Sequence, residues 1–349
     1  MNVPFAPIGL AAFGLSLTLA VVAAVPAPGR AAPDGLVVDT ASGNVLTVED
    51  LSERLLAADV VVLGETHDSR DHHRRQAAII ADLAAAGRRP AVVFEMLSRE
   101  QQPAIDAFLA GGEPASGFGD AVDWARNWNA FEIYEQVIAA AMAAKLPVVA
   151  GDVPREERRR IGKEGVEALA EETRTAFGLD RPLPEAITAH LSDILVASHC
   201  GMIPPEATGP MIDVQRLRDG AMAAALRERL GAAPENRPAV LIAGAGHARR
   251  DFGVPAVLAA LDPELHVLAL AFVPAPPGAA IADLVERDVY GEPLYDVVVA
   301  TADDRPAGDP CTAMRARAAG KTPAMGGAGD EAAAQDGPVA ERRPAEAGQ

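Results

Sequence analysis

The stretch "DVVVLGETHDSR", residues 59–70, decides the fold class. Its apolar run is rich in β-branched valine, which is typical of a strand buried on both faces of a sheet. The run ends at Gly64, and Glu65 and His67 follow before a helix pattern begins near residue 70. A carboxylate and an imidazole at the end of a core strand indicate either a hydrogen-bonded helix cap or a functional site.

Apolar strand patterns and helix patterns alternate along the chain. Strands are predicted at 59–64, 90–95, 146–151, 238–244, 265–272 and 295–301, and helices at 70–86, 99–110, 131–144, 154–174, 184–199 and 209–230. This alternation predicts an α/β fold with a mostly parallel central sheet flanked by helices. The segment from about 154 to 235 has no strand pattern, so we interpret it as a helical insertion, or lid, after the third core strand.

Ionisable side chains follow four of these strands. The carboxyl ends of parallel strands meet at one edge of a sheet, where ligands bind in open α/β folds. We therefore expect the polar residues of the four strand ends to converge on one pocket: Glu65, His67, Glu95 and His247, accompanied by Asp152, Arg155, Arg249 and Arg250. On the helices beside them, His72 with Gln76 and Gln215 with Asp219 continue apolar stripes that should face the same crevice.

Two carboxylates and two histidines allow two kinds of chemistry. Glu65, His67, Glu95 and His247 are candidate ligands of a divalent metal that would lower the pKa of bound water. The same four are candidate catalytic residues without a metal, one histidine acting as general base and a carboxylate fixing its tautomer. The alternative is an internal hydrogen-bond network without turnover.

Aromatic residues are scarce, yet four of the fourteen lie together. Trp124, Trp128, Phe131 and Tyr134 fall at helical spacing within "DWARNWNAFEIYEQV", residues 123–137. Such a stripe is a core feature or a wall for a flat apolar macrocycle. A tyrosine phenolate is also one of the side chains that coordinate haem iron.

The remaining composition sets the location and excludes one partner. With 31 basic and 49 acidic residues, the formal charge of −18 excludes a nucleic-acid surface. Residues 1–33 contain an uncharged run, 8–25, which predicts a signal peptide or an uncleaved anchor of an exported protein. No cysteine lies near that run, so a lipoprotein is not expected. Residues 34–302 form the predicted domain, and 303–349 should be disordered. Cys200 and Cys311 could pair or remain as thiols.

The sequence resembles the ChaN-like, haem-binding uptake family of the Tiki and erythromycin esterase-like superfamily. The resemblance rests on "LGETHDSRDHHRRQ", "VVFEMLSREQQPAIDAFL", "SHCGMIP", "DVQRLRDGAMAAAL" and "IAGAGHARRDFGVPA". It implies a haem-binding envelope protein that serves haem or iron uptake together with envelope or membrane components. It further implies a homodimer with haem groups paired at its interface. The wider superfamily implies the alternative, a hydrolase that uses the two G-x-x-H motifs ending at His67 and His247.

The resemblance also assigns cofactor-binding roles. It makes Tyr134 the candidate axial ligand of haem iron. We expect Trp128 to form part of the apolar wall, His72 to point at the crevice, and Arg249 to meet the haem propionates.

Overall fold

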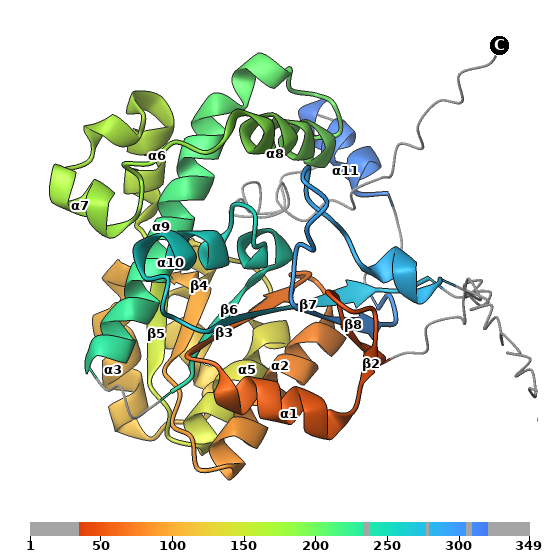
Figure 1. Ribbon diagram of the computed structural model, residues 1–349. Helices are drawn as coiled ribbons and strands as arrows, with labels where there is room; N and C mark the ends of the chain where they lie inside the picture. Colours follow the sequence, from red (N-terminus) through yellow and green to blue (C-terminus); the bar gives the residue numbers. More distant parts are fainter. Residues whose placement is uncertain (1–34, 233–236, 277–278, 305–308, 320–349) are drawn as a thin grey trace, which may run out of the picture.

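The fold is built on one eight-stranded sheet whose central strands are parallel. The computed structural model describes residues 35–232, 237–276, 279–304 and 309–319. The strand order is β2-β1-β8-β7-β3-β6-β4-β5 (Figure 1). The bounds are β1 Val37–Asp39, β2 Val45–Leu46, β3 Val60–Glu65, β4 Val92–Ser98, β5 Val148–Asp152, β6 Ala239–Gly244, β7 Val267–Pro274 and β8 Val297–Thr301.

The mostly parallel sheet that we predicted is confirmed. β3 lies between β6 and β7 and pairs parallel with both, and β4, β5 and β8 continue the parallel arrangement. β1 pairs antiparallel with β2 and β8 at one edge. All six predicted strand patterns correspond to β3–β8, because their valine, leucine and isoleucine side chains are buried on both faces.

Helices cover both faces of the sheet. Side chains of α1, α2, α3 and α5 form one core against the sheet, and those of α9 and α10 form a second core on the opposite face (Figure 1). The bounds are α1 Val48–Ala57, α2 Arg70–Ala85, α3 Gln102–Gly111, α4 Phe118–Ala121, α5 Phe131–Ala143, α6 Arg155–Glu164, α7 Glu171–Ala176, α8 Glu185–Ser198, α9 Gly209–Ala232, α10 Val254–Leu261 and α11 Pro310–Ala318.

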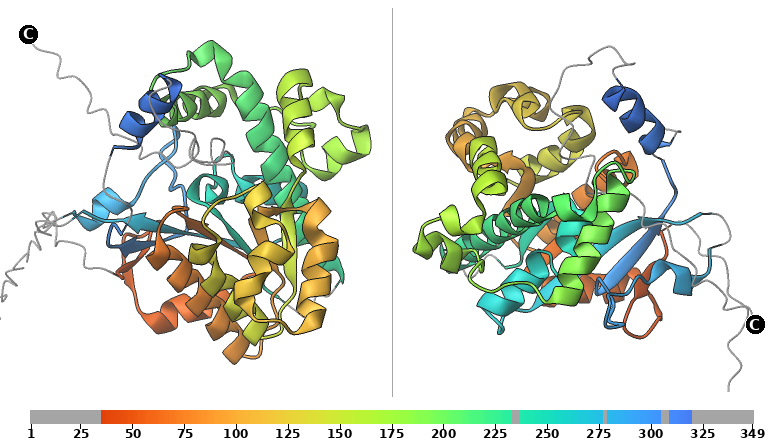
Figure 2. Two further views of the ribbon diagram at one scale, coloured as in Figure 1. Left: turned by 180° about the vertical axis from the view of Figure 1, so that it is seen from behind. Right: turned by 90° about the horizontal axis from the view of Figure 1, so that it is seen from above.

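The chain between β5 and β6 is helical wherever it is described, as the sequence indicated. Its helices, yellow-green to green, form a group at the top of the left view in Figure 2. The single helix predicted over 154–174 is interrupted: α6 ends at Glu164, and Gly165 has φ +80°. Glycine adopts that left-handed conformation without a side-chain clash, so the chain turns there into the 3₁₀ helix η4, Val166–Ala168.

The aromatic stripe does not lie on one helix, which corrects the prediction. Trp124 belongs to the 3₁₀ helix η3, Trp124–Arg126, and α5 begins only at Phe131, after Ala130 with φ +52°. The rings still pack together, because the ring centroid of Trp124 lies 5.2 Å from the ring centroids of both Phe131 and Tyr134. The elements that were not predicted include β1, β2 and α1, whose apolar runs are brief and partly exposed.

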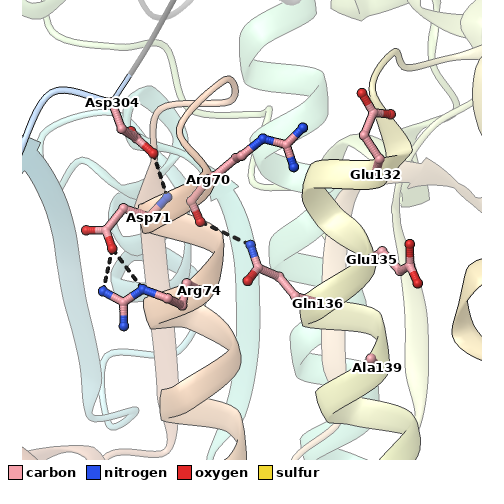
Figure 3. A pocket seen from close by; sticks show the side chains of 8 residues that line it. All are labelled: Arg70, Asp71, Arg74, Glu132, Glu135, Gln136, Ala139 and Asp304. Carbon is pink, nitrogen blue, oxygen red and sulfur yellow. Dashed lines mark hydrogen bonds and ion pairs between the residues drawn. The ribbon is translucent and has the colours of Figure 1, made fainter.

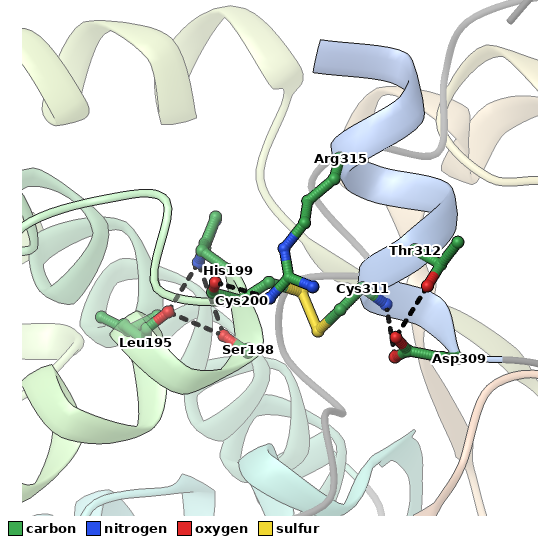
Figure 4. The surroundings of a disulfide bond; sticks show 8 residues. All are labelled: Leu195, Ser198, His199, Cys200, Asp309, Cys311, Thr312 and Arg315. Carbon is green, nitrogen blue, oxygen red and sulfur yellow. Dashed lines mark hydrogen bonds between the residues drawn. A yellow bond between two sulfur atoms is a disulfide. The ribbon is translucent and has the colours of Figure 1, made fainter. Parts of the chain in front are cut away.

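Part of the segment predicted to be disordered, 303–349, is folded in the described residues 309–319. Residues 310–318 form α11, and Cys311 forms a disulfide with Cys200 at the end of α8 (Figure 4). A cross-link anchors a segment whose side chains alone could not bury enough apolar area. The predicted signal or anchor lies outside the described residues. Within the described ranges, no helix is long and apolar enough to cross a membrane.

Candidate functional site

The four strand-end residues converge, as predicted. His67 Nδ1 lies 2.9 Å from Glu65 Oε1, and His247 Nε2 lies 3.2 Å from Glu95 Oε1. The two pairs meet where His67 Nε2 lies 4.0 Å from Glu95 Oε1. Side chains from the ends of β3, β4 and β6, spread over more than 180 residues, therefore form one polar cluster at the carboxyl edge of the sheet. Their catalytic role remains a prediction.

The half of the cluster at the end of β3 is built around Glu65. Its Oε1 accepts hydrogen bonds from His67 Nδ1 and, at 3.0 Å, from the Tyr134 hydroxyl. Its Oε2 lies 3.4 Å from His73 Nε2 and has no hydrogen-bond partner among the described residues. Only His67 reaches the surface, with 13 % of its side chain exposed. Glu65 therefore fixes the orientation of the His67 ring, whose buried Nε2 atom points towards Glu95.

The other half is a balanced network of buried charges. Arg218 from α9 donates to Glu95 at 2.7 Å and to Asp152 at 2.9 Å. Arg158 also pairs with Asp152, and His247 Nδ1 lies 2.6 Å from Asp219 Oδ1. Three carboxylates thus face two guanidinium groups and one imidazole. Such pairing is needed because an uncompensated charge in this interior would be strongly destabilising.

The network fixes its own protonation states. Burial alone would lower the pKa of His247, but the carboxylates of Glu95 and Asp219 outweigh it and raise the pKa to about 10. Burial alone would raise the pKa of Glu95, yet His247 and Arg218 hold that pKa well below its usual range. His247 is therefore an imidazolium at neutral pH, and Glu95 is a carboxylate.

Glycine lets the two G-x-x-H turns pack against each other. The second turn forms the 3₁₀ helix η7, Ala245–Ala248, directly after β6. A Cβ on Gly64 would lie 2.7 Å from the Cβ of Ala248 and 3.1 Å from the Cα of Ala245. A side chain at Gly64 would separate the turns, so the spacing of His67 from His247 depends on this close contact.

A polar cavity of 530 Å³ lies outside this cluster, between α2 and α5 (Figure 3). It was not predicted from the sequence. The Arg70 side chain extends from α2 towards α5, Glu132 lies at the start of α5, and the Gln136 side chain donates to the Arg70 carbonyl oxygen at 3.0 Å. Asp304, from the segment after β8, forms part of its wall.

The sequence profile of one family matches residues 51–258, more than half of the chain. That family is described as haem-binding uptake, Tiki superfamily, ChaN. The chain belongs to it. The expected family membership is thereby confirmed, and the matched range includes all four converging residues.

Solved structures with similarity to this chain include one whose fold it shares, that of a ChaN protein. ChaN of Campylobacter jejuni, whose structure shows cofacial haem binding, is 20 % identical over 78 % of this chain and 98 % of its own, with a TM-score of 0.59. The type III effector HopBA1 is 16 % identical over 79 % and 98 %, with a TM-score of 0.43. A mutant of the erythromycin esterase EreC is 13 % identical over 79 % and 99 %, with a TM-score of 0.45. No curated protein gives a significant match.

The role of Tyr134 as the axial ligand of haem iron stays a prediction, and its surroundings in this structure do not favour it. Its side chain is fully buried, and its hydroxyl is hydrogen-bonded to Glu65. Burial, and then the neighbouring Glu65 carboxylate, raise the pKa of Tyr134 well above its usual range. The phenolate that haem iron requires is therefore disfavoured at this position.

Two further cofactor-binding assignments, those of His72 and Arg249, stay predictions that burial does not favour. His72 is buried, accepts from the Thr66 amide at 2.9 Å and contacts Thr301 Oγ1 at 2.9 Å. Arg249 is buried in a two-bond ion pair with Asp251, at 2.9 and 2.7 Å, so its guanidinium is already neutralised. Trp128 does lie at the site, edge-on to His67 with ring centroids 4.7 Å apart, and its role in ligand binding stays a prediction.

No metal-binding arrangement is found at the four converging residues, and their role as metal ligands stays a prediction. Among the described residues, no group of three or more His, Cys, Asp or Glu side chains is arranged to hold a metal ion. The physical reason is the pairing itself. Arg218 occupies Glu95, and His247 is protonated between two carboxylates, so its nitrogen lone pairs are not free to bind a cation.

Sequence reasoning missed the cations that hold this cluster together. Arg218 and Arg158 lie in helical patterns in which charged side chains are usually exposed to solvent. In the structure both are buried. One signal was available for Arg218. It lies next to Asp219 and one helical turn after Gln215, on the same stripe of α9. Three polar side chains on one buried face of a helix require hydrogen-bond partners.

Proposed function

We propose that this protein binds haem on an exposed surface and serves haem or iron uptake outside the cytoplasm. The observation that carries the proposal is the match of residues 51–258 to the haem-binding uptake family. The polar cluster at the strand ends is too tightly paired to provide a porphyrin site, so the ligand is to be sought among exposed donors.

The chemistry of the exposed donors suits haem iron. Proteins coordinate haem iron through His, Cys, Met or Tyr side chains. Both cysteines are in a disulfide, and Tyr134 and Tyr295 are buried. Tyr290, in contrast, is 61 % exposed, and the adjacent Val289 is 45 % exposed. A phenol beside an apolar side chain offers one iron ligand and one contact to the porphyrin face. Among the tyrosines, Tyr290 is therefore the candidate axial ligand in place of Tyr134.

Tyr290 stands on a firmly folded loop. Asp288 Oδ1 accepts from the backbone amides of Tyr290 at 2.8 Å and Glu292 at 2.9 Å. The base of the loop is closed by the bond from the Leu294 amide to the Glu286 carbonyl oxygen, at 3.0 Å. The Arg250 amide, just beyond His247, donates to the Leu294 carbonyl oxygen at 2.8 Å. The loop is therefore anchored to the turn that follows β6, with its tip free to meet a ligand.

Two further expectations belong to this proposal. Export is supported by the Cys200–Cys311 disulfide, because disulfides persist in oxidising compartments. A homodimer with haem at its interface is supported by the exposed apolar tip at Val289 and Tyr290, since a porphyrin bound there on one face would leave its other face for a second copy.

A hemin titration followed by size-exclusion chromatography tests the proposal. Hemin should give a Soret band and should shift the protein to the elution volume of a dimer. Tyr290→Phe should weaken hemin binding by at least about tenfold, the scale on which changes around a metal ligand act. It should also remove the visible bands of a ferric phenolate complex.

Matched variants control for other ligands. Tyr134→Phe removes a buried hydroxyl, and Met202→Leu removes the sulfur of a side chain that is 41 % exposed. Both should retain the spectrum of the unmodified protein. Loss of the phenolate bands in Tyr134→Phe but not in Tyr290→Phe would restore Tyr134 as the ligand, and the absence of any Soret band at stoichiometric hemin would refute haem binding.

The Glu65–His67 pair supports a second candidate, metal-independent hydrolysis. With Nδ1 held 2.9 Å from the Glu65 carboxylate, His67 has the carboxylate-oriented imidazole of a general base, although its Nε2 atom is buried in this structure. Turnover of a simple activated ester should then depend on His67 and not on the exposed His266 at the opposite edge. Equal residual rates in His67→Ala and His266→Ala would exclude this candidate.

A further inference from the structure

The segment that follows β8 is attached to the start of α2. Asp304 Oδ1 accepts from the Ser69 hydroxyl at 2.5 Å, and Asp304 Oδ2 accepts from the Asp71 amide at 2.9 Å. A carboxylate at this position satisfies an otherwise unpaired amide of the first helical turn and interacts favourably with the helix dipole. Asp304 is therefore a cap for α2 that comes from more than 230 residues further along the chain.

The turn that Asp304 caps is the turn that carries His67. His67 lies two residues before Ser69, and its carbonyl oxygen faces His73 Nε2 at 3.1 Å. A second bond joins the same two segments, because His72 Nε2 lies 2.9 Å from Thr301 Oγ1 at the end of β8. Residues 301–304 thus hold the first turn of α2 at two points, and with it the one partly exposed side chain of the strand-end cluster.

The disulfide anchors the same segment at its far side. Cys311, seven residues after Asp304, is bonded to Cys200, whose carbonyl oxygen also accepts from Arg315 at 3.4 Å (Figure 4). Asp309 caps α11 by accepting from the Cys311 amide and the Thr312 hydroxyl, each at 2.9 Å. Asp304 is consequently held between two fixed points, β8 and the disulfide, which raises its effective concentration at the start of α2.

Cys200 occupies a backbone position that does not favour cysteine. Its φ of +58° is left-handed, directly after α8, where glycine is the usual residue. The neighbouring Gly201 has φ +67°. Both cysteines are half-buried, so a dithiol can reach the disulfide sulfurs.

We propose that the Cys200–Cys311 disulfide is a redox-controlled latch on the His67 turn. One thiolate of a small dithiol attacks a disulfide sulfur and forms a mixed disulfide, and its second thiol then displaces the other cysteine. Two electrons and two protons pass to Cys200 and Cys311, and the dithiol becomes a disulfide. The reduced segment keeps its attachment through β8 but loses the covalent one at Cys311, so Asp304 leaves the start of α2 more often. The His67 turn and the wall of the adjacent cavity then open together (Figure 3).

Diethylpyrocarbonate modification of single histidines, mapped by peptide mass spectrometry, tests the latch. The full chain is compared before and after reduction with dithiothreitol and alkylation of the thiols. His67 should react about fivefold faster after reduction, the scale expected when a helix cap is lost from a local opening equilibrium. The exposed His266, at the opposite edge of the sheet, provides the internal standard and should not change.

Variants separate the two parts of the latch. Asp304→Asn keeps the disulfide but weakens the cap, so His67 should react faster in the oxidised protein. Asp309→Asn changes the matched carboxylate at the start of α11 and should leave the His67 rate unaltered. Cys200→Ser with Cys311→Ser should reproduce the reduced protein.

Either of two results would overturn the latch. The first is an unchanged His67 rate after complete reduction. The second is an unchanged rate in Asp304→Asn, which would show that Asp304 does not couple the disulfide to the turn. If the reduced protein unfolds, as circular dichroism would reveal, the Asp304→Asn result alone decides.

Discussion

His247 Nδ1 lies 2.6 Å from Asp219 Oδ1, and both side chains are buried. Glu95 contacts the other ring nitrogen at 3.2 Å, so the imidazole is held between two carboxylates. The relationship is reciprocal. The histidine charge is stable there only because of the carboxylates, and burial raises the pKa of Asp219 even in the presence of His247.

The first prediction is that stability falls at alkaline pH because of His247. Its pKa rises from 6.5 to about 10 on folding, so its contribution is complete below pH 6.5 and is lost as pH approaches about 10. Asp219→Asn removes one carboxylate, which should flatten this alkaline loss. It should also cost about 3–5 kcal/mol at pH 7, as expected for breaking a buried ion pair. Urea unfolding between pH 6 and pH 10 measures both effects.

The control for this prediction is Asp193→Asn, which changes an exposed aspartate on α8. Its free energy of unfolding should stay within about 0.5 kcal/mol of the unmodified protein. An alkaline slope that is equally steep in Asp219→Asn would show that His247 is neutral in the folded protein.

The second prediction concerns acid. Burial lowers the pKa of His72 from 6.5 to about 4. The unfolded chain therefore binds a proton to His72 before the folded protein does, and stability is lost as pH falls from 6.5 towards 4. His72→Asn should be less stable at pH 7, because it loses a contact, but it should lack this acid-dependent loss. The difference between the two proteins should narrow by on the order of 3 kcal/mol at pH 4. A difference that is constant with pH would contradict the assignment.

The strands of the parallel core could be predicted because the signals that define them lie within each short stretch of sequence. Strands such as 59–64 and 238–244 are short, β-branched and bounded by glycine or proline, and those signals survive without tertiary information. The convergence of Glu65 and His247 could be predicted as well, because strand ends share an edge whatever the strand order.

What could not be predicted depends on contacts between distant segments. Tyr134 has the residue type and the neighbours of a haem ligand, yet its burial by α2 and β3 turns it into a hydrogen-bond donor to Glu65. The chain after 303 has the composition of a disordered segment, but its residues 309–319 are folded and are attached to the domain by a disulfide. In both cases the residue that makes the contact, Glu65 or Cys200, lies more than 65 residues away in the sequence. A pattern within a short stretch of sequence cannot predict such a contact.

The third prediction is a stability cost of reducing the disulfide. Cys200 and Cys311 are separated by 111 residues, so the cross-link restricts a long loop of the unfolded chain. Chain-entropy arguments give up to about 4–5 kcal/mol for a loop of that length. The free energy of unfolding should therefore be lower in the reduced, alkylated protein, which urea titration with and without reductant measures. Equal midpoints would mean that the disulfide constrains only a segment that unfolds independently of the core.

The last prediction tests the close contact between the two G-x-x-H turns. Gly64→Ala would place a methyl group 2.7 Å from Ala248 Cβ and 3.1 Å from the backbone at Ala245, so β3 and the turn after β6 must separate. Overpacking of this kind costs about 1–3 kcal/mol. Gly231→Ala is the matched control, because a Cβ there meets nothing within 4 Å and the residue lies in α9. That variant should be neutral or more stable by up to about 1 kcal/mol, since alanine favours the helix. Thermal unfolding of both variants should give shifts of opposite sign or of clearly different size, and equal shifts would show that the turns are not in close contact at Gly64.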